Sequence, residues 1–392
     1  MSAPAGPSPS TTNNTTPSKP SPPSIGWQLL RQRPLADTTG ASSLAGKTVL
    51  VTGANSGLGL AAATKFASLR PARLILAVRN PDAGHDAKNL IAQSLLQLGN
   101  NHSNNNNAGD APASAPVQID VWPLEMTSYA SIAALARRAA AELDRLDVAV
   151  LNAGVYEAAP GASAYGWERT VQVNALSTAL LALLLLPKLR ASAALRSGGA
   201  GGRGDGAGAG PAVLQVVASR RAEAVQVTEE MRTGRVLEVV GRVREAGYKP
   251  SEQYRVSKFL AMAVVKKLAG LVDPSEVLVT AVCPGGVATN LSRGWTGVVA
   301  TVVKAVLNAL ALRTPEYAAR SVVSGALLGS EASGKLWYDD ELHELSNLAG
   351  DEGEELASKI WAEVTEALRR DLPEVDEVVK TLPEHRTAVS SH

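Results

Sequence analysis

Six short runs of Val, Ile, Leu and Ala alternate along this chain with segments of helical spacing. The runs occupy residues 48–52, 73–78, 117–121, 148–151, 213–217 and 277–282. Most of them lack polar alternation, as expected for a parallel sheet that is covered on both faces. The helical segments between them then serve as right-handed crossovers. The pattern predicts an α/β fold, a three-layer doubly wound parallel sheet (Rossmann) of six to seven strands, with residues 335–338 as the seventh.

Segments of biased composition divide the rest of the chain. The Ser-, Thr- and Pro-rich start cannot bury enough apolar surface to offset its ordering entropy, and we expect a disordered tail there. The Asn- and Gly-rich internal stretches are interpreted as flexible loop insertions. The expected organisation is a tail over 1–25, one domain over 44–345 with insertions at 99–116 and 197–211, a helix over 354–372 and a polar tail over 373–392.

Composition excludes several function classes. Lys and Arg total 38 against 37 Asp and Glu, with no basic cluster, so no nucleic-acid partner is expected. The five histidines are scattered without ligand spacing, so we expect no metal site. Cys283 is the only cysteine, which excludes an intrachain disulfide and agrees with a cytoplasmic location. No window of about 18 apolar residues predicts a transmembrane segment.

A glycine-rich turn follows the first run, with the sequence Thr52-Gly53-Ala54-Asn55-Ser56-Gly57-Leu58-Gly59. Glycines allow the backbone to approach a pyrophosphate, and the next helix offers free N–H groups and its positive end. The alternative, a plain glycine turn, is weakened by the position after the first strand of a βαβ pattern. We therefore expect Thr52, Gly53, Asn55, Ser56, Gly57, Leu58 and Gly59 to hold a dinucleotide.

The end of the second run indicates which dinucleotide is bound. Enzymes that prefer NAD place an acid there for the ribose hydroxyls, and no acid lies between Leu74 and Asn80. Arg79 instead offers a fork of donors for a 2′-phosphate, which favours NADP(H). The alternative is a solvated arginine after a strand.

Tyr254 and Lys258 stand four residues apart in an expected helix, so both project from one face. A phenol has a pKa of about 10, and an adjacent ammonium lowers that pKa, which makes the phenol a usable acid/base. A tyrosine and an exposed lysine on a helix surface remain the structural alternative. Ser219 follows the fifth run and can hold a substrate oxygen, or it is a simple turn serine. Asn174 is unusual in an apolar helix, because asparagine has a low helix propensity. It either takes part in a proton path or is a buried amide with its hydrogen bonds satisfied.

Together these motifs resemble the short-chain dehydrogenase/reductase family in its compact form, over most of residues 44–345. The resemblance is carried by T-G-x-x-x-G-x-G at 52–59, Asn152-Ala153-Gly154, Asn174, Ser219, the pair Tyr254 and Lys258, and Pro284-Gly285-x-Val287-x-Thr289. The sequence around Tyr254 and Asn174 is most similar to the retinol dehydrogenase and WW-domain oxidoreductase branch. Glu125 stands where the family has an adenine-contacting Asp, and Ala218 replaces the first of two serines.

The resemblance implies a catalytic set of Asn174, Ser219, Tyr254 and Lys258. It adds Glu125, Asn152, Ala153, Gly154, Pro284, Gly285, Val287 and Thr289 to the cofactor-binding residues, with Asn174, Tyr254 and Lys258 counted there too. It implies hydride transfer with NADP(H) on a small-molecule carbonyl or alcohol, and a homodimer. The alternatives are an inactive NADP(H)-binding scaffold or sensor and a membrane-surface protein. Residues 220–248 and 293–313 are expected to line the substrate pocket, the second as a lid or as an ordinary packed helix.

Overall fold

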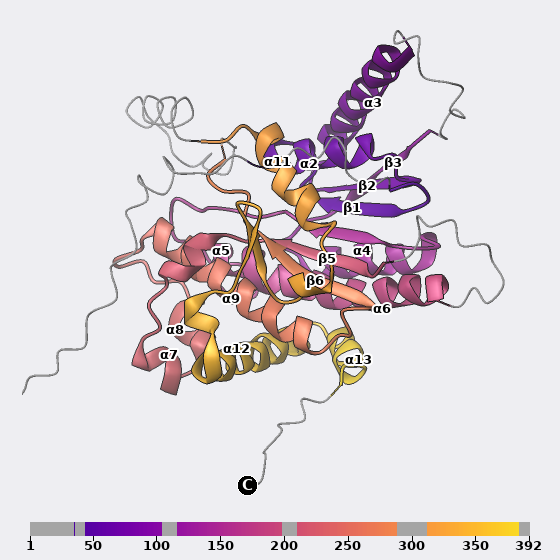
Figure 1. Cartoon of the computed structure of the whole chain (residues 1–392). Coiled ribbons are helices and arrows are strands. Elements are labelled where there is room, and N and C mark those ends of the chain that lie inside the picture. Colours follow the sequence, from indigo (N-terminus) through magenta and orange to yellow (C-terminus); the bar gives the residue numbers. More distant parts are fainter. Residues whose placement is uncertain (1–34, 36–43, 104–115, 198–209, 288–311, 384–392) are drawn as a thin grey trace, which may run out of the picture.

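The computed structural model describes residues 35, 44–103, 116–197, 210–287 and 312–383. Its centre is one sheet of order β3-β2-β1-β4-β5-β6-β7-β8 (Figure 1). Strands β1 to β7 pair in parallel and β8 pairs antiparallel with β7. The strands are β1 (Thr48–Thr52), β2 (Arg73–Val78), β3 (Gln118–Pro123), β4 (Val148–Leu151), β5 (Ala212–Val217), β6 (Val277–Val282), β7 (Leu336–Tyr338) and β8 (Glu341–His343). The doubly wound parallel sheet is confirmed, and chain order reverses between β1 and β4.

The eighth strand was not predicted. It has three residues and joins β7 through a turn at Asp339 and Asp340, whose φ angles are +50° and +58°. Aspartate tolerates this left-handed conformation better than most residues, which suits a tight hairpin. A three-residue strand is too short to show a periodic pattern, so no sequence signal indicated it.

Helices cover both faces of the sheet, which makes the three predicted layers (Figure 1). One face packs against α2 (Gly57–Ser68), α3 (Pro81–Ser103) and α11 (Pro315–Gly325). The other packs against α4 (Tyr129–Glu142), α6 (Thr178–Ser197) and α9 (Pro250–Gly270). Every residue of β1, β4, β5 and β6 is buried, because these central strands have a helix layer on each side.

The helix expected over 165–189 begins later and is not uniform. It starts as α5 (Arg169–Val171), passes through a π-helical turn, η1 (Gln172–Ser177), and continues as α6. The stretch Arg169–Leu195 is apolar and long enough to cross a membrane by composition. However, 89% of its apolar window is buried inside the fold, as befits a core helix.

The C-terminal part departs from the sequence prediction. Helix α12 (Gly350–Asp371) packs on α9, and residues that we expected in a polar tail form α13 (Glu374–Lys380), which packs on α6. The tail prediction was wrong for this segment because Val375, Val378, Val379 and Leu382 form an apolar stripe among charged residues. Within this stripe, the side chains of Val375 and Leu382 are buried.

Several expected segments lie wholly or mostly outside the described residues: the tail over 1–25, most of both insertions and most of 293–313. The expected pocket segment 220–248 contains three short helices. They are η2 (Arg220–Ala224), α7 (Glu229–Thr233) and α8 (Val236–Val240).

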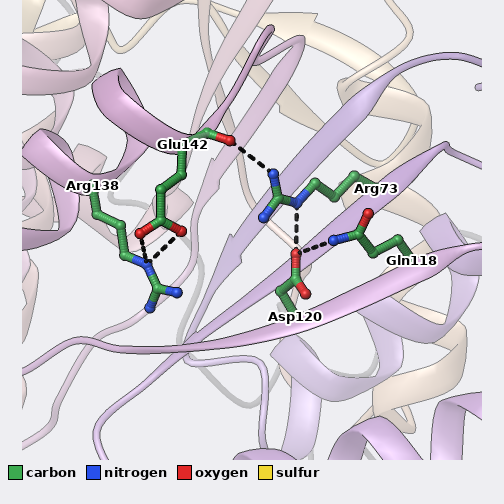
Figure 2. Close-up of polar contacts among 5 residues, drawn as sticks. All are labelled: Arg73, Gln118, Asp120, Arg138 and Glu142. Atoms are coloured by element: carbon green, nitrogen blue, oxygen red, sulfur yellow. Dashed lines mark hydrogen bonds and ion pairs between the residues drawn. The ribbon is translucent and has the colours of Figure 1, made fainter.

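A polar network joins β2, β3 and α4 at the amino ends of the two strands (Figure 2). Arg73 Nε binds Asp120 Oδ2 at 2.5 Å, and Gln118 Nε2 donates to the same oxygen at 3.0 Å. A second Arg73 nitrogen donates to the carbonyl of Glu142 at the end of α4, and Arg138 binds the Glu142 carboxylate at 3.0 Å. Both arginines therefore face a carboxylate of the protein itself.

Candidate active site

The glycine turn between β1 and α2 has the geometry of an anion cradle. Gly53 and Gly57 have φ of +66° and +52°, which favours glycine at both positions. A Cβ at Gly59 would overlap with the Gly53 carbonyl oxygen. The first helical bond at this end runs from Leu60 N to the Ser56 carbonyl, so the amides of the three preceding residues point out of the helix end. These residues fit the pyrophosphate of a dinucleotide.

Thr52 closes the base of this turn and takes a structural part. Its hydroxyl oxygen accepts hydrogen bonds from the backbone N–H groups of Asn152 and Ala153, each at 2.9 Å. The Asn152 side chain donates back to the Thr52 carbonyl at 2.8 Å. The carboxyl ends of β1 and β4 are thereby joined at the point where the strand order reverses, where doubly wound sheets bind their ligands.

Asn174 lies in the π-helical turn η1 and links two other elements. Its side-chain oxygen accepts from Val155 N at 2.8 Å, and its amide donates to the Val155 carbonyl at 2.9 Å and to Ser257 Oγ at 3.0 Å. π-helical turns are rare and are found mostly at functional sites. The asparagine is thus a satisfied amide that ties the segment after β4 to α9, one turn from Tyr254.

Tyr254 and Lys258 lie on the same side of α9. Lys258 Nζ is 5.8 Å from the centre of the Tyr254 ring and donates to the Val217 carbonyl at the end of β5 at 2.8 Å. A Cβ at Gly154 would stand 3.0 Å from Asn174 Oδ1 and 3.7 Å from Lys258 Nζ. The structure therefore brings Asn174, Gly154, Tyr254 and Lys258 into one cluster.

The electrostatics of this cluster correct one expectation. Burial raises the pKa of Tyr254 above its ordinary value, and Arg221 opposes that shift. Burial lowers the pKa of Lys258 to about 8. We expected the lysine to lower the pKa of the phenol, but desolvation of the phenolate raises it and outweighs the opposing positive charge, which is that of Arg221. Tyr254 is consequently a protonated acid at neutral pH.

Ser219 lies two residues after the end of β5 and is the N-cap of η2. It is 9% exposed, and its hydroxyl oxygen accepts from Arg221 N at 3.3 Å. Helix α9, which carries Tyr254, packs against η2, the helix that Ser219 caps. The hydroxyl proton is available to a substrate oxygen, since this bond uses the oxygen as acceptor.

The segment after β6 is held by residues far along the chain. Arg313 donates to the Pro284 carbonyl at 3.1 Å and binds Asp339 at 2.6 Å, with both side chains almost wholly buried. Val287 also forms a bridge with Arg313. The buried Cys283 thiol accepts bonds from the backbone at Arg220 and Gly285, and burial raises its pKa, as expected of a packed thiol.

Pro284, Gly285 and Val287 therefore lie at the carboxyl end of β6, whereas Thr289 lies outside the described residues. The Arg313–Asp339 pair was not predictable, because its members are far apart in the chain and belong to no motif.

Comparison with known proteins decides the family. Residues 47–199 match the family model for short chain dehydrogenases. The short-chain dehydrogenase/reductase phmF of Phaeosphaeria nodorum is 35% identical over 93% of this chain and 98% of its own length. The chain belongs to the short-chain dehydrogenase/reductase family. The family member ffsI of Aspergillus flavipes is also 35% identical, over 90% of this chain and 94% of its own.

Solved structures agree at the level of the fold. A putative NAD(P)-dependent gluconate 5-dehydrogenase from Beutenbergia cavernae superposes with a TM-score of 0.51 at 21% identity, over 76% of this chain and 96% of its own. A 7α-hydroxysteroid dehydrogenase superposes with a TM-score of 0.51 at 20% identity, over 80% and 100%. As a family member this chain is an NAD(P)(H)-binding oxidoreductase. The finer likeness to the retinol dehydrogenase branch stays a prediction.

Two residues expected at the cofactor site follow neighbouring strands: Arg79 comes directly after β2, and Glu125 comes two residues after β3. The Arg79 side chain is 74% exposed, and its Nε lies 3.8 Å from a Glu125 oxygen. The other Glu125 oxygen accepts from Thr127 N at 2.9 Å and from Thr127 Oγ1 at 2.8 Å. Arg79 is thus only loosely paired, while Glu125 is engaged in the turn after β3.

Tyr156 was missed in the sequence, and Arg221 was not singled out within the expected pocket segment 220–248. The Tyr156 ring centre lies 5.5 Å from that of Tyr254, and Arg221 carries a buried Nε without a hydrogen-bond partner in the described part of the chain. The available signal was adjacency, since each follows a motif by two residues, Asn152-Ala153-Gly154 and Ser219 respectively. Among the described residues no group of three His, Cys, Asp or Glu side chains forms a metal site.

Proposed function

We propose that this family member transfers hydride between NADP(H) and the carbonyl or alcohol carbon of a hydrophobic small molecule, with Tyr254 as acid/base. The observation that carries the proposal is the cluster of Tyr254, Lys258, Asn174 and Gly154 at the carboxyl ends of β4 and β5. The cofactor, when bound, supplies or takes up the hydride.

The side chains of the cluster divide the remaining work. Tyr254 donates its proton to the carbonyl oxygen, and the raised pKa keeps that proton in place at neutral pH. Ser219 donates a second hydrogen bond to the same oxygen and orients it. Lys258, bound to the Val217 carbonyl, supplies positive charge beside the phenol, and Asn174 fixes α9 through Ser257.

The preference for NADP(H) rests on Arg79. Its exposed, loosely paired guanidinium is able to reach a 2′-phosphate, and no acid follows β2 that would favour ribose hydroxyls. Glu125, engaged with Thr127, is proposed to border the adenine. A homodimer and the cytoplasm stay our predictions for assembly and location.

The test is reduction of a panel of hydrophobic ketones and aldehydes with NADPH or NADH, comparing the wild type with Tyr254→Phe. Loss of the acid should lower kcat by about 100-fold or more, with the NADPH Kd nearly unchanged. Tyr317→Phe, in α11 on the opposite face of the sheet, is the matched control and should keep full activity.

Two results would contradict the proposal. Substantial turnover by Tyr254→Phe would overturn the acid/base assignment. Tight NADPH binding without reduction of any carbonyl would instead support the scaffold or sensor, the second candidate, which the intact cluster disfavours.

A further inference from the structure

Arg221 occupies a particular place in the proposed substrate cleft. It lies in η2, and its backbone N–H is tied to Ser219 Oγ at 3.3 Å. The residue is partly buried, and its Nε is buried without a hydrogen-bond partner among the described residues. A partly buried guanidinium with an unpaired nitrogen costs free energy, and a ligand that pairs with its charge would offset that cost.

The groups around Arg221 are uncharged phenols rather than carboxylates. Burial raises the pKa of Tyr254 and of Tyr156, and the positive charge of Arg221, in the helix η2 that packs on α9, opposes both shifts. Tyr156 and Tyr254 themselves lie 5.5 Å apart between ring centres. Arg221 therefore borders the place where a substrate carbonyl would meet the Tyr254 hydroxyl.

The acids that surround the cleft are already engaged. Glu157 pairs with Arg169 at 3.8 Å, and Asp339 with Arg313 at 2.6 Å. Glu223 accepts from Ser346 N at 3.3 Å and points away to the surface. In the described part of the chain, no ion pair neutralises Arg221.

The preceding arginine behaves differently. The Arg220 guanidinium lies 4.6 Å from the centre of the Tyr338 ring, a cation–π arrangement that satisfies it within the protein. Two adjacent arginines thus have separate environments: one covers an aromatic ring, and the other has neither an ion pair nor a ring contact among the described residues.

We propose that Arg221 binds a carboxylate of the substrate, which makes the enzyme selective for hydrophobic keto acids or hydroxy acids. The planar guanidinium offers parallel donors that match the two carboxylate oxygens. The inference rests on the proposed function, because it names the substrate class of that same cleft.

The experiment compares 3-benzoylpropionate and 4-benzoylbutyrate with their methyl esters as ketone substrates, using NADPH. For at least one chain length, the wild type should show a kcat/KM about tenfold or more above that of the ester. Arg221→Gln and Arg221→Met should abolish this preference, and Arg221→Lys should keep part of it. Arg232→Gln is the matched control: Arg232 lies in α7 and pairs with Glu352 at 3.0 Å, so its loss removes one charge and should leave the preference intact.

A binding measurement separates this inference from the proposed function. Calorimetric titration of each acid and ester into NADPH-loaded Tyr254→Phe, with and without Arg221→Met, reports carboxylate recognition without turnover.

If ketones are reduced but acids and esters perform alike, Arg221 does not select the substrate, and the inference fails while the proposed function stands. If no ketone is reduced but acids bind in an Arg221-dependent way, the proposed function fails and only carboxylate binding by Arg221 is supported. A preference for acids that persists in both Arg221→Gln and Arg221→Met overturns the inference. Circular dichroism verifies that each variant is folded.

Discussion

The two ends of the parallel strands use arginine in opposite ways. At the amino ends, Arg73 and Arg138 bind Asp120 and Glu142 (Figure 2), and Arg145 binds the buried Asp147 at 2.6 Å. At the carboxyl ends, Arg79 is exposed and 3.8 Å from its nearest acid, and Arg221 has a buried nitrogen without a partner among the described residues. Apart from Arg313, which pairs with Asp339 at the carboxyl ends, the arginines at the amino ends hold the sheet together and those at the carboxyl ends are left for ligands.

This division follows from the architecture. Parallel strands bring their carboxyl ends to one edge, where the helices begin and their free N–H groups gather. A ligand that is to bind there must find donors that the protein has not already satisfied. The amino ends carry no such requirement, so pairing their charges costs no function and adds some stability.

The largest effect that would sharpen the comparison is expected at Gly59. A Cβ there would overlap with the Gly53 carbonyl oxygen and displace the turn, so Gly59→Ala should weaken NADPH binding by about 100-fold. Nicotinamide fluorescence measures this directly. Gly270→Ala, at the end of α9 with nothing within 4 Å of the added atom, is the matched control and should bind normally. Equal affinity of both variants would show that the turn does not hold the cofactor.

The pH dependence of ketone reduction comes next in size. Burial lowers the pKa of Lys258 to about 8, so its positive charge is lost above that pH. Tyr254 has a raised pKa and keeps its proton over the same range, so it does not cause the decline. We expect kcat/KM for reduction to fall by about tenfold per pH unit above the Lys258 pKa, measured with saturating NADPH. If kcat/KM stayed constant to higher pH, the positive charge of Lys258 would not be needed for the reaction.

Arg79 provides a test of cofactor choice at the same edge. Arg79→Gln should weaken NADPH binding by about tenfold and leave NADH binding unchanged, because one charge-assisted bond to the 2′-phosphate is lost. Arg138→Gln removes an arginine from the amino ends and should alter neither affinity. An equal loss for both cofactors in Arg79→Gln would mean that Arg79 supports the fold rather than the 2′-phosphate.

The smallest effect is expected at the amino ends themselves. Asp120→Asn removes the carboxylate that Arg73 and Gln118 share, and should lower the free energy of unfolding by about 1 kcal/mol, since the pair is partly exposed. Urea denaturation followed by circular dichroism measures this, with the NADPH Kd unchanged. Glu142→Gln, in a more exposed pair, should cost less. A changed Kd in Asp120→Asn would break the division between the two ends.

Local sequence was enough for most of the sheet and for the motif residues. Buried runs such as Thr48–Thr52 and Val277–Val282 are predictable because a strand covered on both faces tolerates little but aliphatic side chains. The pair Tyr254 and Lys258 is predictable because helical spacing alone puts both on one face. The strand β8 and helix α13 were missed, since one is three residues long and the other hides its apolar stripe among charges.

Contacts between distant segments were not predictable. The bonds of Asn174 to Ser257 and of Arg313 to Asp339 join parts of the chain that share no pattern. The pKa of Tyr254 was expected to fall and instead rises, because the degree of burial depends on how α9 packs against η2 and the residues after β4 and β6.

The sequence by itself determined the doubly wound sheet, the glycine turn at Thr52–Gly59 and the identity of the proposed acid, because each depends on residue types at fixed local spacing. Only the tertiary structure decided which charges are neutralised and which face the cleft. An arginine is the same residue at Arg73 and at Arg221, and the difference lies in whether the fold brings a carboxylate to it.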